Sequence, residues 1–405
     1  MIDRAVAVRE LQRIASWWLE HSLDDDHGGF VGEIDSAGQP VPGASKGVIL
    51  NSRILWFFSE LTIFKEDARY RAAADRAFDY LLRHFDDPVH GGAVWELTAD
   101  GRLANGKKQV YAQCFCIYAL SAYYRLTANP RALAKALEYF GRLESTATDR
   151  KFGGFVDAFS QSWHSIDDYR LGPGNLNAAK SMHTHLHVVE AYTALYRTAE
   201  PAVTHAALRD ALRAALQGAI ETFCRHCIDR NTGHVALYFD RDWSRVDSSI
   251  SFGHDVEASW LLYEAADALD NTETTLEVAP LAERLAFTCH DEAIGEHGQV
   301  FNGYDPETGV TATESIWWVQ AEALVGFLNA YRRTGKWKYR VAADRVWNHV
   351  RKCHLDEIAG EWHWLSTADH DAAQAHYKAG FWKAPYHNGR AMLQTIRMFE
   401  TTGQS

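Results

Sequence analysis

Histidines at regular spacings are the residues of this sequence best suited to chemistry. The segment SMHTHLHVVE carries His183, His185 and His187 at alternate positions. In a β-strand all three side chains would share one face, because side chains there repeat every two residues. In a helix only His183 and His187 would align, four residues apart. The histidines can bind a metal, move protons or pack, and the choice depends on the secondary structure.

Two further motifs place ionisable side chains inside apolar runs. Arg53 lies in LNSRILWFF, and a buried arginine needs either a carboxylate partner or a ligand. SFGHDVEASW places His254 and Glu257 three residues apart, on one helix face. A carboxylate in that position can raise the pKa of the imidazole and hold its orientation.

Aromatic residues accompany these ionisable groups. The chain contains 14 tryptophans, whose broad rings either fill a core or stack on the apolar faces of sugars. ESIWWVQAEA contains Trp317, Trp318 and Glu322, and WKAPYHNGR contains Trp382 and His387. Such residues gathered at equivalent ends of several helices would form the mouth of a barrel.

Glycine-containing turns divide the chain at intervals of about 60 to 80 residues. Each consists of an aspartate, a few polar residues, a glycine and then alternating apolar residues, which predicts a tight turn followed by a short strand. The six segments are LDDDHGGFVGEID, FDDPVHGGAVWEL, TDRKFGGFVDAF, IDRNTGHVALYF, HDEAIGEHGQVFNGYD and LDEIAGEWHWL.

Between these turns, apolar patterns of period 3.6 predict about twelve helices, two in each gap. Six helix pairs suggest an all-α fold, a closed (α/α)6 barrel with short β-hairpins in its loops, formed by residues 1–405 as one domain. The last helix would pair with the first. The more apolar, inner helices are expected to begin near Lys46, Gln109, Lys180, His254, Glu314 and Tyr386.

Composition excludes several functions. The net charge is −12 and no Lys/Arg-rich run is present, so neither nucleic acid nor a membrane is an expected partner. We find no secretory signal and no apolar run of about 18 residues, and we expect a cytoplasmic protein. The CxxC of Cys224 and Cys227 has no second pair, so buried, reduced thiols are expected rather than a zinc or redox site.

The motifs KGVILNSRILWFFSE, KSMHTHLHVVEAYTALY, GHDVEASWLL, WWVQAEA and WKAPYHNGR resemble, in this order, those of the cellobiose 2-epimerases. These enzymes belong to the N-acylglucosamine 2-epimerase superfamily, and the match covers nearly the whole chain. The resemblance implies an (α/α)6 barrel, in agreement with the helix count. It also implies an isomerase that epimerises C2 of a reducing-end sugar, without a cofactor, through an enediolate.

The resemblance assigns roles to individual residues. His254 and His387 would exchange protons with C2 from opposite sides, and imidazole suits this task because it titrates near neutral pH. Arg53 would stabilise negative charge on the substrate oxygen, and Glu257 would tune His254. The sugar would be bound by His187, His183, Tyr111, Trp317, Trp318 and Trp382.

The histidine segment is then an inner helix, in which His185 points away from its neighbours as a structural hydrogen bonder. Two histidines on one face are too few for a zinc site, so we expect no metal. His183 departs from the resembled family, which usually has Asn there, and Ala384 replaces a usual Cys or Gly. Both differences leave open whether the substrate is a disaccharide or a free hexose.

Three other functions compete with this interpretation. A mannose isomerase would use the same enediolate but return the proton to C1. A glycoside hydrolase would need two flanking carboxylates, for which Asp255 and Glu257 are the candidates. A non-catalytic sugar-binding barrel would not need both His254 and His387. In each case the partner is a small sugar, and we expect a monomer or a weak homodimer.

Overall fold

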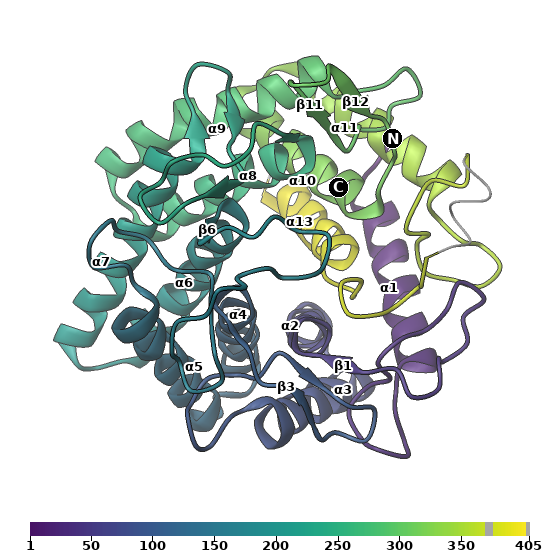
Figure 1. Ribbon diagram of the computed structural model, residues 1–405. Helices are drawn as coiled ribbons and strands as arrows, with labels where there is room; N and C mark the ends of the chain where they lie inside the picture. Colours follow the sequence, from purple (N-terminus) through teal and green to yellow (C-terminus); the bar gives the residue numbers. More distant parts are fainter. Residues whose placement is uncertain (369–375, 402–405) are drawn as a thin grey trace.

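The computed structural model of the protein describes residues 1–368 and 376–401, and its helices form two concentric rings (Figure 1). Each helix of the inner ring packs against the next, and the last packs against the first, which closes the barrel. In chain order the inner helices are α2 (Val48–Phe64), α4 (Val110–Thr127), α6 (Met182–Ala202), α8 (Phe252–Leu269), α10 (Trp317–Thr334) and α13 (His387–Thr401).

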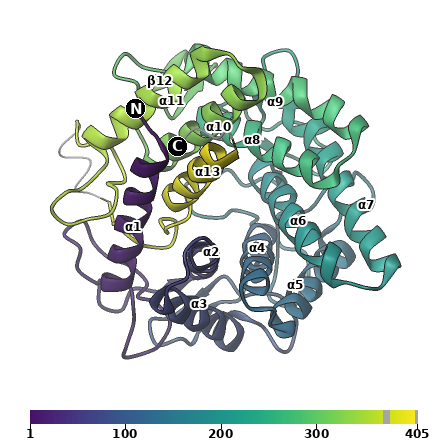
Figure 2. The same cartoon turned by 180° about the vertical axis from the view of Figure 1, so that it is seen from behind.

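The outer ring surrounds the inner one, and each outer helix packs mainly on one inner helix (Figure 2). The first helix of the chain covers α13, as the sequence pattern predicts, so the two ends of the chain complete the same pair. The outer helices are α1 (Arg4–His21), α3 (Ala68–Tyr80), α5 (Pro130–Arg142), α7 (Ala206–Thr222), α9 (Thr272–Glu292) and α11 (Trp337–Cys353). Three of them end in a π-helical turn, at Leu81–Phe85, Leu143–Ala147 and Phe223–Cys227.

Burial explains which helices lie inside. Every residue of α2 from Val48 to Thr62 is buried, whereas α3 buries only a stripe of apolar positions and leaves its charged residues exposed or half-buried. A helix that is apolar on all sides is stable only where neighbours cover all of it. The fold is therefore the (α/α)6 barrel predicted from the sequence, with inner helices that begin within three residues of the expected positions.

Short antiparallel strands occupy the loops at the end of the barrel where the inner helices begin. Four of them, β1, β4, β6 and β10, run directly into α2, α4, α6 and α8. Two sheets have three strands: β1 (Lys46–Gly47), β2 (Glu96–Leu97) and β3 (Leu103–Asn105); and β10 (Ile250–Ser251), β11 (Gly303–Asp305) and β12 (Val310–Ala312). Three are pairs: β4 (Lys108–Gln109) with β5 (Ala158–Phe159), β6 (Lys180–Ser181) with β9 (Tyr238–Phe239), and β7 (Ile228–Asp229) with β8 (His234–Val235).

Buried lysines hold four of the glycine-containing turns, and three of these lysines lie two residues before an inner helix. In the first turn, Asp24 accepts backbone hydrogen bonds from Asp26 and His27. Lys46 donates from Nζ to Asp24 Oδ2 at 2.6 Å and to the Gly28 carbonyl at 2.7 Å. The same contact recurs in the pairs Lys108–Asp87, Lys180–Asp149 and Lys378–Asp356. The charges of these lysines are thus paired, and the first three turns are tied to the inner helix that follows the lysine.

A sequence repeat determines how far along the barrel axis each side chain lies. Its positions are counted from position 0, a residue shortly before each inner helix, which is Lys46, Lys108, Lys180, Ile250, Ser315 or Lys383. Position 5 ties the helix to the strand after the preceding turn in the pairs Gln113–Ala93, His185–Phe155, Asp255–Val235 and Gln320–Val300. Position 7 points to the barrel axis and is occupied by Arg53, Phe115, His187, Glu257, Glu322 and Arg390.

His185 illustrates position 5. Its Nε2 accepts the backbone N–H of Phe155 at 3.0 Å, so its proton is on Nδ1, which contacts the Ser181 carbonyl at 2.7 Å. The prediction of a structural hydrogen bonder is confirmed. All six cysteines lie in the described residues and are free, with Cys224 and Cys227 buried, as expected. In the described parts of the chain, no helix has the length and apolarity that a membrane span requires.

Candidate active site

A cavity of about 320 Å³ opens among the first turns of the inner helices. All ten residues expected at the site line it, which are His254, His387, Arg53, Glu257, His187, His183, Tyr111, Trp317, Trp318 and Trp382. Three lining residues were not expected: Leu171, Asn175 and Trp364. The helical pattern therefore brings together side chains that are up to 334 residues apart in the sequence.

His254 and His387 reach the cavity from two helices that flank α10. Both occupy position 4 of the repeat, on α8 and α13, so they lie at a similar depth. Both rings contact the indole of Trp318 on α10, at centroid distances of 4.7 Å for His254 and 5.6 Å for His387. One cavity is thus bordered by two imidazoles that approach it from different directions, with an aromatic surface between them.

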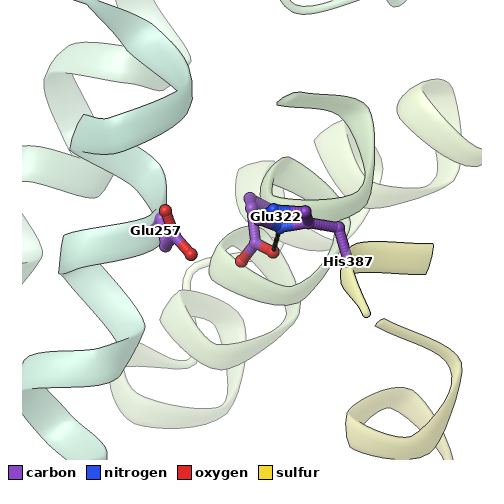
Figure 3. A group of neighbouring side chains, drawn as sticks. All are labelled: Glu257, Glu322 and His387. Atoms are coloured by element: carbon purple, nitrogen blue, oxygen red, sulfur yellow. Dashed lines mark hydrogen bonds and ion pairs between the residues drawn. The ribbon is translucent and has the colours of Figure 1, made fainter. Parts of the chain in front are cut away.

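A carboxylate holds the ring of His387 (Figure 3). Its Nδ1 lies 2.6 Å from Glu322 Oε1. Glu322 also accepts from Arg390 Nη2 at 2.7 Å and, on Oε2, from Trp260 Nε1 at 3.0 Å. Because both of those groups can only donate, Glu322 acts as an acceptor and the His387 proton lies on Nδ1. Nε2 is left without a proton in the neutral ring, as a base requires.

His254 has an uncharged partner instead. Its Nδ1 contacts Ser251 Oγ at 2.7 Å, and its ring meets that of His183 edge-on at 4.5 Å. Burial, followed by the neighbouring His183, His187 and His387, holds the pKa of His254 well below its ordinary value. Among the described residues no hydrogen bond or ion pair joins His254 to Glu257, whose Oε1 accepts from Arg390 Nη2 at 2.7 Å, and the role of Glu257 in tuning His254 stays a prediction.

Arg390 does not line the cavity but bonds the lining residue Glu257, and it was not predicted. Its side chain is fully buried and contacts three carboxylates, those of Glu190, Glu257 and Glu322. Burial and the negative charge of Glu322 raise the pKa of Glu257 to about 8, so Glu257 keeps its proton at neutral pH. Burial alone would raise the pKa of Glu190, but Arg390 and His187 lower it to about 2. The three carboxyl groups around Arg390 therefore carry fewer than three negative charges.

By distance alone, Glu257, Glu322 and His387 can hold a metal ion, because one ligand atom from each lies within 4.8 Å of the others (Figure 3). However, Arg390 Nη2 is 2.7 Å from an oxygen of each glutamate. A guanidinium therefore already supplies the positive charge between these two carboxylates, and a metal ion there would be repelled by it.

Arg53 is placed to meet a ligand oxygen. It donates from Nη1 to the Trp382 carbonyl and from Nη2 to Tyr111 Oη, both at 3.0 Å. Its guanidinium also lies over the ring of Phe115, 4.3 Å from the centroid. The sequence left open a carboxylate partner or a ligand for Arg53, and among the described residues it has no carboxylate partner. A fixed positive charge that lacks a counter-ion suits an anionic intermediate.

His187 and His183 share one side of the cavity but differ in their partners. Nδ1 of His187 lies 2.8 Å from Glu190 Oε2, and its ring packs edge-on against Tyr111 at 4.8 Å. Within the described residues, Nδ1 of His183 has no hydrogen-bond partner. Burial is the largest cause that lowers the pKa of His183 to about 4, so the ring is neutral. It can therefore donate or accept one hydrogen bond to a ligand.

The sequence did carry signals for the residues that were missed. Glu190 and Arg390 each follow a site histidine by three residues, His187 and His387, within apolar helices. A charged residue in such a position must be paired when buried, but its partners come from other helices and nothing local identifies them. Asn175 and Leu171 lie in a loop with no repeat pattern, so no sequence signal placed them at the cavity.

Comparisons with known proteins agree with this geometry. The model of the N-acylglucosamine 2-epimerase family matches residues 28–391. A cellobiose 2-epimerase of Bacteroides fragilis is 36% identical over 95% of this chain and 96% of its own length. The structure of a cellobiose 2-epimerase from Bacillus thermoamylovorans superposes with a TM-score of 0.90 at 30% identity, over 97% and 98% of the two chains. A D-mannose isomerase, at 19% identity and a TM-score of 0.82 over 97% of each chain, shares the fold.

The fold and the full-length relatives place the protein among the isomerases that act on carbohydrates. Within that class, the chain belongs to the N-acylglucosamine 2-epimerase family. The family membership, the isomerase class and the sugar 2-epimerase function predicted from the sequence motifs are thereby confirmed.

Proposed function

We propose that the protein interconverts the glucose and mannose configurations at C2 of a reducing-end aldose. The proposed substrates are a cellobiose-type β-1,4 disaccharide or the free hexose. The observation that carries this proposal is the placement of His254 and His387 on two helices that border one cavity and contact the same indole. Inversion at a carbon requires a proton to leave one face and another to arrive on the opposite face.

The proposed reaction begins with an opened sugar ring. A neutral imidazole, that of His254 or His387 according to the configuration at C2, takes the C2 proton on its Nε2. The C–H electron pair forms the C1–C2 double bond, and the carbonyl π electrons move to O1, giving a cis-enediolate. The intermediate is planar at C2, so the other imidazole, as imidazolium, can return a proton to the opposite face. Each turnover thus exchanges the protonation states of the two histidines.

Other residues of the cavity support this chemistry in the proposal. Arg53 would bind the oxygen that gains negative charge, because its guanidinium is fixed by Tyr111 and the Trp382 carbonyl. His187, oriented by Glu190, would bond the sugar near its ring oxygen and assist ring opening. The sugar faces would stack on Trp317, Trp318 and Trp382, whose apolar surfaces also keep water from the intermediate.

The test is a product panel in D2O. Cellobiose, mannobiose, glucose and mannose are each incubated with the protein, and products are separated by chromatography and examined by NMR. We expect the C2 epimer with deuterium at C2. A ketose with deuterium at C1 would instead favour the mannose isomerase alternative. Binding without any deuterium incorporation would contradict enzyme function and favour a sugar-binding barrel.

We further propose that residues 1–405 form a single catalytic domain that acts in the cytoplasm, without a metal, as a monomer or weak homodimer. Pairing of α1 with α13 supports the single domain, because the ring needs both ends of the chain. Limited proteolysis that released a stable fragment of the barrel would contradict it. Light scattering over a range of protein concentrations measures the oligomeric state.

A further inference from the structure

The two histidines at the cavity have partners of different chemistry. His387 donates from Nδ1 to the carboxylate of Glu322 at 2.6 Å, whereas Nδ1 of His254 contacts the hydroxyl of Ser251 at 2.7 Å. A carboxylate stabilises an imidazolium by charge, and a hydroxyl does not. Because a hydroxyl can donate or accept, it also tolerates either tautomer of the ring it contacts.

The side chain of Ser251 contacts His254 and does not cap its helix. Ser251 is the N-cap residue of α8, where a serine normally accepts a backbone N–H of the first helical turn. Its side chain makes no such bond. Ser181 occupies the equivalent place before α6, at position 1 of the repeat, and does cap its helix, by accepting the N–H of Thr184 at 3.2 Å. The hydroxyl of Ser251 therefore bonds the imidazole, and the first turn of α8 lacks the side-chain cap that α6 has.

We propose that Ser251 is a positioning residue, which holds the His254 ring with Nε2 toward the cavity and keeps it the less easily protonated member of the histidine pair. This inference rests on the proposed function. Ser251 touches no reacting atom in this proposal and acts only through His254. The structural basis is its hydrogen bond, made in place of the helix cap.

The surroundings of His254 supply no charge that would replace a carboxylate. From α6, His183 and His187 face it, and from α13 His387 does, and none of these rings carries a negative charge. From α10 it meets the uncharged ring of Trp318. On its own helix, Glu257 is bonded to Arg390. Burial holds the pKa of both imidazoles well below the ordinary value, and of the two only His387 has a carboxylate at hydrogen-bond distance, so His254 is presented as a neutral base.

Three variants of Ser251 test the inference, with the activity of the wild type in D2O measured first. Ser251→Thr keeps a hydroxyl and should keep kcat within about threefold of the wild type. Ser251→Ala removes the hydrogen bond and should lower kcat at least about tenfold, with little change in KM. Ser251→Asp places a carboxylate beside Nδ1, and the acid limb of kcat/KM should move about one to three pH units higher.

Ser181→Ala is the matched control, because it removes an N-cap serine from the neighbouring inner helix. It should lower the melting temperature but leave the acid limb in place. A wild type that turns over while Ser251→Ala keeps its kcat, or Ser251→Asp keeps its pH profile, would overturn the inference. A wild type that yields no epimer from any sugar would overturn the proposed function instead. Circular dichroism identifies a variant that fails to fold, and the other two variants of Ser251 then test the inference.

Discussion

His254 on α8 and His387 on α13 occupy the same position of the barrel repeat, and one inner helix, α10, lies between α8 and α13. Both rings contact Trp318 of α10. Because α8 and α13 both flank α10, the two imidazoles reach the cavity from different sides. A cavity bordered in this way suits proton transfer to opposite faces of one carbon.

Replacement of either histidine by alanine should abolish turnover without unfolding the barrel. General acid–base groups typically contribute about 10²- to 10⁴-fold to the rate, and each residue is needed in every inversion. His297→Ala is the control, because its side chain is 75% exposed and remote from the cavity residues. Deuterium incorporation at C2 and circular dichroism are the measurements. A near-normal rate in either His254→Ala or His387→Ala would refute the two-base assignment.

The substitution His183→Asn, which introduces the residue usual in the resembled family, should move the acid limb of activity to higher pH. Burial and then His183 are the two leading causes that lower the pKa of His254. Removal of the second imidazole raises this pKa toward its ordinary value. Since the base must be neutral, activity then begins to fall at a higher pH as the solution is acidified.

The measurement is kcat/KM against pH, for cellobiose and for glucose separately. The smaller asparagine should also change the ratio of the two substrates, because His183 lines the cavity and its Nδ1 has no protein partner among the described residues. An unchanged pH profile would show that His183 does not influence His254.

Glu257→Gln should reduce the dependence of stability on pH. The pKa of Glu257 is raised from 4.5 to about 8, chiefly by burial, so the folded protein binds a proton that the unfolded chain releases between these values. Stability from this group is complete below pH 4.5 and is lost as the pH rises through 8, with a slope of up to about 1.4 kcal/mol per pH unit. Glutamine cannot titrate.

Urea denaturation at several pH values measures this slope. Asp157, whose pKa burial raises to about 7, contributes a similar slope to both proteins, so the difference between wild type and variant isolates Glu257. Parallel curves for the two proteins would mean that Glu257 is ionised at neutral pH.

Much of the barrel was predictable from the sequence because its signals are local. The glycine turns mark every second loop, and apolar residues on all sides of a helix identify an inner helix, as in Val48–Thr62. A position near the start of an inner helix then placed residues such as Arg53 and His387 at a common mouth. Each of these inferences depends only on residues that are close to one another in the sequence.

Pairing across the barrel was not predictable in the same way. Glu257 shares a helix face with His254, yet it bonds Arg390, because both occupy position 7 of the repeat and hence the same depth. The two are 133 residues apart in the sequence. Depth in a closed ring follows from the repeat register, which becomes clear only once position 0 is identified before every inner helix.

Arg390→Met should destabilise the protein severely. The substitution leaves Glu190 and Glu322 buried without their main counter-ion, and breaking a buried ion pair typically costs about 3–5 kcal/mol. Arg69→Met is the control, because its partner Asp67 is at the surface and no measurable change is expected. Urea denaturation at neutral pH compares the two variants. Equal stabilities would show that the carboxylates are neutral without Arg390.

Exhaustive chelation should leave the activity of the wild type unchanged. The described group best placed to bind a metal is Glu257, Glu322 and His387, and Arg390 already contacts both of its carboxylates (Figure 3). The proposed reaction needs only the Arg53 guanidinium to hold negative charge on the substrate oxygen. The protein is dialysed against EDTA, its metal content is determined by elemental analysis, and initial rates are compared before and after addition of Mg²⁺, Mn²⁺ or Zn²⁺. A rate that falls on dialysis and returns with one of these ions would establish a metal-dependent reaction, and Glu322→Gln would then be expected to weaken binding of that ion.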